Sequence, residues 1–196
     1  MIGASGWTAG RLLLAAPLSA ILLAGVFVWL LQPDAPPRTS EARELGETVP
    51  SLVVLVRHAE RDGPSADDPG LTERGGERAE ALSRALAEVG ITAIHATAFV
   101  RTRQTAAPLA TLLGLEVELF DHRALASLAD AIRERPGRHF VVGHSNTTDE
   151  LAALLGGRSH GPIADEWEYD RLYLLTPAPD GSMTTALLRY GPISEP

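Results

Sequence analysis

The stretch Leu52-Val53-Val54-Leu55-Val56-Arg57-His58-Ala59-Glu60 decides how the rest of the chain is understood. Five consecutive apolar residues that include several valines are typical of a strand buried on both faces of a parallel sheet. In such sheets ligands bind at the carboxyl ends of the strands. Arg57 and His58 follow the apolar run at that end, so we interpret them as the centre of an active site.

The composition excludes several classes of protein. Of 196 residues, 45% are hydrophobic and 21% are charged, which is typical of a globular protein. The net charge of -8 argues against a nucleic-acid binder. The absence of cysteine excludes disulfides, thiolate-bound zinc and a cysteine nucleophile. His139 and His144 would fall on opposite faces of a strand, and we expect neither a metal nor a cofactor.

The N-terminal part has a composition of its own. After a tail at residues 1–11, residues 12–32 are almost entirely apolar, and Leu12 to Leu31 contains no charge. Twenty helical residues at about 1.5 Å each match the roughly 30 Å hydrocarbon core of a bilayer. We therefore expect an N-terminal transmembrane helix at residues 12–32. A cleaved signal peptide is the alternative, although no clear cleavage site accompanies the apolar run.

The same segment suggests a location. Arg11 and the terminal amine favour an N-terminus in the cytoplasm, which would place the rest of the chain in the periplasm or outside the cell. Residues 33–50 are rich in proline and are expected to form a linker. Residues 51–196 are the expected catalytic domain, and the lipid bilayer is the expected partner of residues 12–32.

Within residues 51–196, short apolar runs alternate with helical patterns. Strands are expected at 52–56, 91–97, 115–120, 139–143, 169–176 and 183–190, and helices from about 72 to 89 and at 101–113, 124–135 and 147–155. This alternation predicts an α/β fold. We expect a three-layer sandwich in which helices flank a largely parallel central sheet, with the last two strands as a candidate antiparallel pair at one edge.

Charged side chains follow three of the expected strands. Arg57 and His58 follow the first strand, Arg101 begins the helix after the second, and His144 directly follows the strand at 139–143. Parallel strands would bring these side chains to one edge of the sheet. Two arginines and two histidines there suit a phosphoryl group, because arginine binds phosphate oxygens bidentately and a neutral imidazole can attack phosphorus.

Four motifs occur in one order: Arg57-His58-Ala59-Glu60, Leu71-Thr72-Glu73-Arg74-Gly75, Arg101-Thr102-Arg103-Gln104-Thr105 and Gly143-His144-Ser145-Asn146. Together they resemble the histidine phosphatase superfamily, also called phosphoglycerate-mutase-like, over residues 51–196. The lack of large inserts resembles its compact phosphohistidine-phosphatase-like branch. The resemblance implies that His58 is the phosphorylated nucleophile. It also implies that Arg57, Arg101 and His144 complete the phosphate pocket, and that Asn146 contacts the substrate.

The implied activity is that of a phosphoric monoester hydrolase of the histidine acid phosphatase type, acting on a phosphorylated small molecule or phosphoprotein. A non-catalytic phosphoryl-binding module is the alternative, and a phosphoglycerate mutase is a third possibility. The proton donor stays open among Glu60, Glu116, Glu118 and Asp121. A missing donor would favour substrates with a good leaving group, such as phosphohistidine, over alkyl phosphates.

Overall fold

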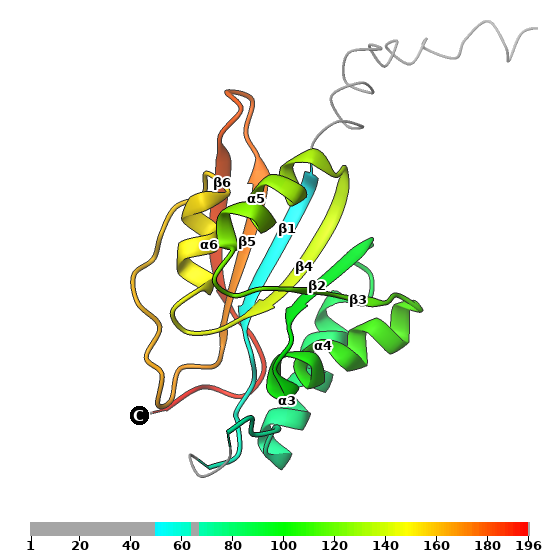
Figure 1. Cartoon of the computed structure of the whole chain (residues 1–196), viewed down its shortest axis with the longest axis vertical. Coiled ribbons are helices and arrows are strands. Elements are labelled where there is room, and N and C mark those ends of the chain that lie inside the picture. The colour runs from blue at the N-terminus through cyan, green and yellow to red at the C-terminus, as the bar shows by residue number, and fades with distance from the viewer. Residues whose placement is uncertain (1–49, 64–66, 196) are drawn as a thin grey trace, which may run out of the picture. The chain divides into compact units, whose positions relative to one another are not determined.

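The computed structural model describes residues 50–63 and 67–195 of the chain. Within these residues the strands are β1 (Pro50–Arg57), β2 (Ala93–Thr97), β3 (Val117–Phe120), β4 (Gly137–Gly143), β5 (Arg171–Pro177) and β6 (Met183–Arg189). The helices are α3 (Glu73–Leu86), α4 (Val100–Leu113), α5 (Leu125–Glu134) and α6 (Thr148–Leu154). The predicted alternation of strands and helices is thus present (Figure 1).

The strands form one sheet in the order β3-β2-β4-β1-β5-β6. The pairs β1–β4, β2–β4 and β2–β3 are parallel, whereas β5 is antiparallel to both β1 and β6. The sheet is therefore mixed: its four neighbouring strands β3, β2, β4 and β1 are parallel, as predicted, and the expected antiparallel pair β5–β6 lies at one edge. The reason lies in residues 155–170, which carry the chain without a helix from the end of α6 back to the level of Arg57, so that β5 has to run in the opposite direction.

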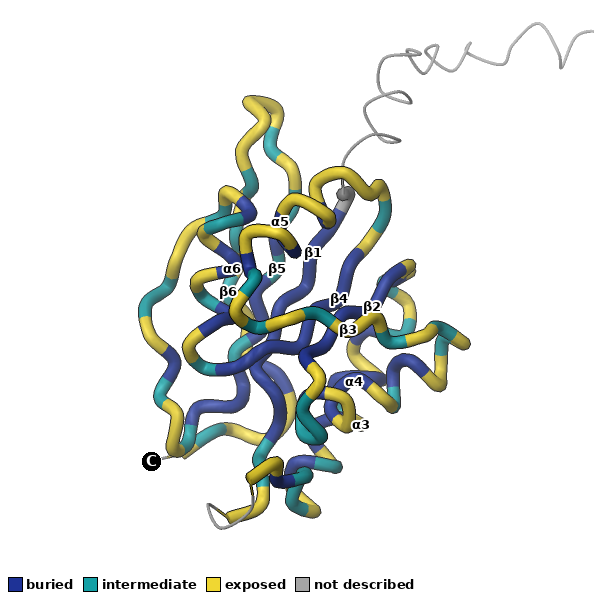
Figure 2. Tube along the Cα trace, viewed as in Figure 1, coloured by how far each residue is buried: buried dark blue, intermediate teal, exposed yellow. Residues whose placement is uncertain are grey.

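The core consists of two apolar layers, one on each face of the sheet. Val54 and Val56 pack with residues of α3 and α4, whereas Val53 and Leu55 pack with residues of α5 and α6. Alternate side chains of a strand point to opposite faces, and β1 is apolar on both, which is why it is buried in the middle of the molecule (Figure 2). The three layers agree with the sequence prediction.

The predicted transmembrane helix is not among the helices that the structure describes. Across residues 50–63 and 67–195 none of the helices combines the length and apolar character needed to cross a bilayer. For these residues the fold class is therefore corrected to a mixed α/β sandwich. Residues 12–32, on whose hydropathy alone the prediction depended, lie outside the described residues. The bilayer contact and the location stay predictions, as do the proposed domain boundaries.

Candidate active site

Two neighbouring parallel strands place the two central histidines side by side. Arg57 at the end of β1 pairs with Gly143 at the end of β4, and the His58 backbone N–H donates to the Gly143 carbonyl over 3.0 Å. The next residue on each strand is a histidine, so the His58 and His144 ring centroids lie 5.4 Å apart. The register of two strands thus produces the pair that the sequence predicted.

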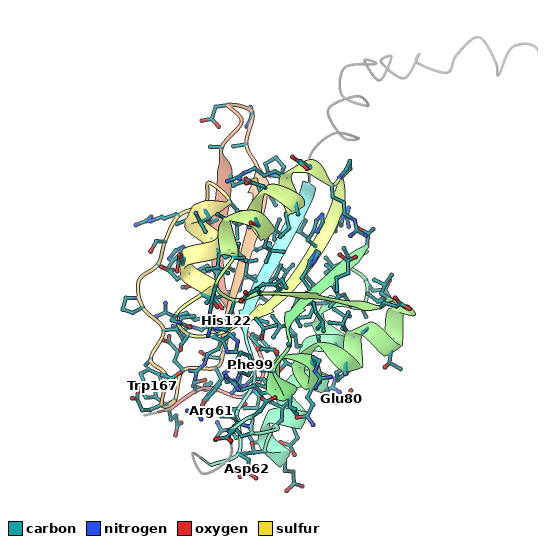
Figure 3. The ribbon with its side chains drawn as sticks, in the orientation of Figure 1. Arg61, Asp62, Glu80, Phe99, His122 and Trp167 are labelled. Atoms are coloured by element: carbon teal, nitrogen blue, oxygen red, sulfur yellow. The ribbon has the colours of Figure 1, made fainter. Side chains whose placement is uncertain are left out.

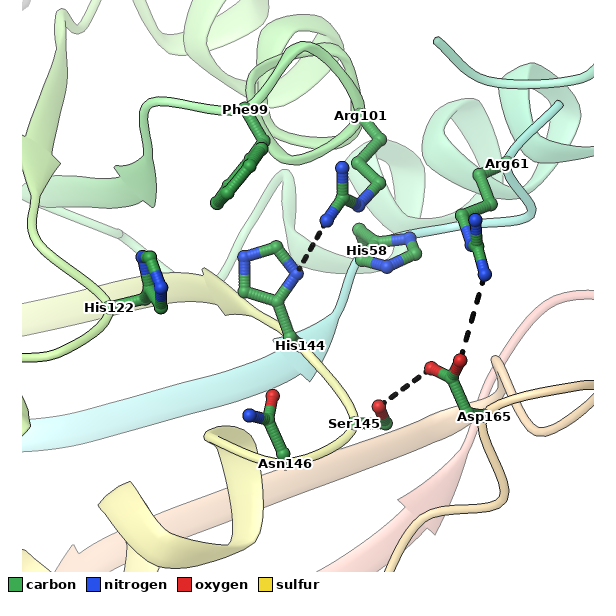
Figure 4. Close-up of a pocket in the computed structure, with 9 residues that line it drawn as sticks. All are labelled: His58, Arg61, Phe99, Arg101, His122, His144, Ser145, Asn146 and Asp165. Carbon is green, nitrogen blue, oxygen red and sulfur yellow. Dashed lines mark hydrogen bonds and ion pairs between the residues drawn. The ribbon is translucent and has the colours of Figure 1, made fainter. Parts of the chain in front are cut away.

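A pocket of about 410 Å³ opens at this edge of the sheet (Figure 4). It is lined by His58, Arg61, Phe99, Arg101, His122, His144, Ser145, Asn146 and Asp165. Four predicted site residues, namely His58, Arg101, His144 and Asn146, therefore meet in one cavity. Their roles in catalysis and binding stay predictions.

The His58 ring is held in one tautomer. Its Nδ1 lies 2.8 Å from the Ala59 carbonyl oxygen, which can only accept, so Nδ1 carries the proton and Nε2 keeps a free lone pair. The side chain is only 2% exposed, and burial lowers the pKa of His58 to about 3, helped by the positive charge of Arg57. His58 is therefore neutral at physiological pH, as a nucleophile must be.

His144 is fixed by polar contacts on the side of β2. Its Nε2 lies 3.0 Å from the Thr97 hydroxyl, and its backbone N–H donates to the Thr147 hydroxyl over 2.9 Å. Burial, followed by the charge of Arg101, lowers the pKa of His144 to about 4. The pocket therefore brings two neutral imidazoles together with the guanidinium groups of Arg61 and Arg101, an arrangement that suits an anion.

Arg101 enters the pocket from the first turn of α4. Its Nη2 lies 3.4 Å from His144 Nδ1, and its guanidinium lies 4.4 Å from the centre of the Phe99 ring. The Asp68 carboxylate accepts from the Val100 backbone N–H over 3.0 Å, which caps a helix that lacks a side-chain cap of its own. Asp68 also offsets the positive charge at this helix start, because its Oδ1 lies 3.4 Å from Arg101 Nη1. The buried Nε of Arg101 finds no hydrogen-bond partner among the described residues.

Arg57 lies beneath the pocket and is not among the residues that line it. Its Nη1 donates to the carbonyls of Ala164 and Glu168 over 2.8 and 3.0 Å, and its Nη2 donates to the Asp165 carboxylate over 2.8 Å. The side chain is 1% exposed. Arg57 thus holds the segment before β5 in place through these hydrogen bonds. Arg61, which was not predicted as a site residue, lines the pocket instead. Direct phosphate contact by Arg57 stays a prediction.

Several lining residues were not foreseen. Phe99, His122, Ser145 and Asp165 line the pocket, although none of them was predicted as a site residue (Figures 3 and 4). A signal for His122 was available, because it follows β3 at the edge where His58 and His144 follow their own strands. Asp165 reaches the pocket from an irregular segment, so no periodic pattern placed it at this edge.

None of the four carboxylates considered as proton donors lines the pocket. Glu60 accepts from Arg78 Nε and Nη2 over 2.8 and 2.7 Å, and Glu118 pairs with Arg135 at 2.6 Å. Glu116 and Asp121 are exposed. In the part of the chain that the structure describes, no group of three or more histidine and acidic side chains is arranged to hold a metal ion.

Part of the chain is similar to proteins of a known family. A sequence model of the histidine phosphatase superfamily (branch 1) matches residues 53–122, which include His58 and Arg101. The PE-PGRS family protein PE_PGRS11 of Mycobacterium tuberculosis is 43% identical over 74 residues. That match covers 33% of this chain, and the chain spans only 13% of the relative's length.

Solved structures share the fold over nearly their whole length. One described as the phosphohistidine phosphatase SixA from Agrobacterium tumefaciens has a TM-score of 0.52 at 22% identity, covering 74% of this chain and 99% of its own. A mycobacterial glucosyl-3-phosphoglycerate phosphatase has a TM-score of 0.55 at 16% identity, covering 71% and 98%. At these identities the similarity establishes the fold. The family match includes the residues that carry His58 and Arg101, so this part of the chain is similar to the histidine phosphatase superfamily.

Proposed function

We propose that this protein is a phosphatase that hydrolyses a phosphomonoester or phosphohistidine substrate through a covalent phosphohistidine intermediate on His58. The observation that carries the proposal is the fixed tautomer of His58. The Nδ1 contact with the Ala59 carbonyl leaves Nε2 unprotonated, in a pocket that also contains Arg61 and Arg101. A neutral nucleophile beside cations is what an attack on a phosphate dianion needs.

In the first step Nε2 of His58 attacks phosphorus and the leaving group departs on the opposite side. Arg61 and Arg101 bind the phosphoryl oxygens, which gain charge as the transition state forms. In the second step water attacks the phosphohistidine and releases inorganic phosphate. Loss of one such preorganised donor often costs a hundredfold or more in rate.

The size of the pocket and the descriptions of similar structures both bear on the substrate class. Two of the similar structures are described as SixA phosphohistidine phosphatases and another as a glucosyl-3-phosphoglycerate phosphatase. Both classes carry a phosphoryl dianion that fits a cavity of about 410 Å³. We propose a phosphorylated small molecule or phosphoprotein as substrate, and hydrolysis of the acid phosphatase type.

One observation favours a phosphoryl-binding module instead, namely that none of the four proposed carboxylate donors lines the pocket. Turnover of p-nitrophenyl phosphate by the full chain and by His58→Asn separates the two functions, with inorganic phosphate binding measured on both proteins. We expect wild-type turnover and a loss of at least about a thousandfold in the variant. Phosphate binding without any wild-type turnover would establish the binding module and refute the phosphatase.

A further inference from the structure

Release of an alkoxide leaving group needs a proton, and the pocket offers two groups outside the central histidine pair that could supply one. Among the described residues that line the cavity, these are the His122 imidazole and the Asp165 carboxyl. They lie at opposite ends of the pocket (Figure 4). Their positions relative to His58 decide which of the two can reach the leaving group.

His122 lies at the far end of a row of three histidine rings that begins with His58. The ring centroids of His58 and His144 are 5.4 Å apart, and those of His144 and His122 are 6.1 Å apart. Figure 4 shows His144 between the other two rings, so the three histidines form a row across the pocket. In-line displacement places the leaving oxygen opposite the attacking nitrogen. The end of the row that faces away from His58 is occupied by His122.

Asp165 lies on the other side and is committed to other partners. Its Oδ1 accepts from the Ser145 hydroxyl over 2.7 Å and pairs with Arg57 at 2.8 Å. The Ser145 hydrogen bond and the charges of Arg57 and Arg61 hold the pKa of Asp165 below its usual value. A carboxylate that is kept ionised beside the nucleophile has no proton to give.

The surroundings of His122 allow it to exchange a proton. Its side chain is 33% exposed, so water reaches it, and its Nδ1 lies 3.6 Å from the Asp121 carboxylate. Phe99 packs against it at 5.5 Å between ring centroids. The titratable groups that face it are Asp121 on its own loop and His144 after β4, and Arg101 lies on the Phe99 ring. Histidine is the side chain most often used for proton transfer near neutral pH.

We propose that His122 is the general acid that protonates the leaving-group oxygen while His58 attacks phosphorus. This inference rests on the proposed function of His58 as the nucleophile. The Nε2–phosphorus bond forms as the phosphorus–oxygen bond breaks, and the departing electron pair takes the proton of the His122 imidazolium. In the second step neutral His122 accepts a proton from the attacking water, and the nitrogen–phosphorus bond breaks, which restores both histidines.

The proposal changes the substrate class expected from the sequence. Without a donor, the enzyme would be restricted to good leaving groups such as imidazole. With His122 as the donor, phosphate esters of ordinary alcohols become substrates as well.

The test compares kcat/KM for two substrates that differ in their need for a proton, p-nitrophenyl phosphate and glycerol phosphate. General acid catalysis contributes roughly 10²–10⁴-fold. We expect His122→Gln to lower kcat/KM about a hundredfold or more with glycerol phosphate, and less than about tenfold with p-nitrophenyl phosphate. We also expect wild-type activity to fall at alkaline pH with glycerol phosphate but not with p-nitrophenyl phosphate, and we expect this fall to be absent in His122→Gln. Added imidazole should restore activity with glycerol phosphate to His122→Ala.

Glu116→Gln is the matched control, because Glu116 is an exposed acid outside the pocket and should leave both values at the wild-type level. Equal losses with the two substrates in His122→Gln, or no loss in either, would overturn the proposal. A selective loss in Asp165→Asn, with none in His122→Gln, would overturn it in favour of Asp165. Failure of the wild type to turn over p-nitrophenyl phosphate would instead refute the proposed phosphatase and the His122 inference with it.

Discussion

At the scale of single residues, the two arginines near His58 differ in burial and in the groups that they contact. Arg57 is buried and donates to backbone carbonyls of the segment before β5, whereas Arg61 is partly exposed and its nearest acid, Asp165, is 3.6 Å away. An arginine fork satisfies several acceptors at once, and a lysine ammonium cannot reproduce that geometry. Arg57 is thus a structural residue as much as a site residue, whereas Arg61 lines the pocket and has a longer, partly exposed ion pair with Asp165.

We therefore predict that Arg57→Lys lowers the free energy of unfolding by about 2–4 kcal/mol, because buried acceptors lose their donors. Arg61→Lys should change it by less than about 0.5 kcal/mol, since an exposed ion pair contributes little, yet weaken phosphate binding severalfold. Urea denaturation and phosphate titration of both variants measure this. Equal stability of the two variants would show that the Arg57 contacts do not hold the segment in place.

The sequence predicted those site residues that directly follow a strand or begin the next helix. His58, His144 and Arg101 were found in this way because parallel strands end at one edge. Asp165 escaped because it contacts Ser145 across 20 positions of sequence through a segment with no periodic pattern. Such contacts depend on the tertiary path of a loop, which local pattern does not encode.

At the scale of elements, the start of α3 is fitted closely against the segment that follows His58. Thr72 caps the helix by accepting from the Gly75 backbone N–H over 3.0 Å, and its own N–H donates to the Glu60 carbonyl. A Cβ on Gly75 would lie 2.2 Å from that carbonyl oxygen. The close approach of helix and strand end therefore requires glycine at this position.

The neighbouring glycine provides a matched control, because a Cβ on Gly76 would meet nothing within 4 Å. We predict that Gly75→Ala lowers the free energy of unfolding by about 1–3 kcal/mol, as overpacking does, and also reduces turnover by displacing the His58 segment. Gly76→Ala should stabilise the protein by up to about 1 kcal/mol through helix propensity. Thermal unfolding and a turnover assay of both variants check these expectations. A Gly75→Ala protein with wild-type stability and activity would contradict the close approach of Gly75 to the Glu60 carbonyl.

Element types followed from the sequence more readily than strand directions. The apolar run of β1, the cap at Thr72 and the glycine after α4 all act locally, so α3, α4 and β1 were predicted close to their observed bounds. The direction of β5 relative to β1 depends on where residues 155–170 carry the chain. That path is set by contacts with Arg57, at a distance in sequence that no local pattern spans.

At the scale of the whole molecule, four histidines are buried and held neutral. Two belong to the pocket, and the other two, His95 and His139, stack at 5.3 Å on the strands β2 and β4. Burial lowers the pKa of His58 to about 3 and that of His95 and His144 to about 4, and it also lowers the pKa of His139. Protonation therefore opposes folding both at the site and away from it.

The sign of the pH dependence follows from these shifts. In the unfolded chain histidine binds a proton below about pH 6.5, whereas the folded protein resists protonation down to about pH 4 or lower. The free energy of unfolding should fall as the pH drops below about 6.5, by up to about 1.4 kcal/mol per pH unit for each histidine. Urea denaturation between pH 7.5 and 5 measures the free energy of unfolding. A constant value across that range would contradict the claim that these histidines are buried in their neutral form.

The central claim is that His58 becomes covalently phosphorylated during turnover. The most direct measurement is rapid quenching of the full chain with phosphorus-labelled substrate, followed by mapping of the labelled residue. The account predicts a phosphoenzyme that is labile in acid and stable in base, with the label on His58, and no labelled protein from His58→Asn. Turnover without any phosphoenzyme, or the same label in His58→Asn, would contradict it.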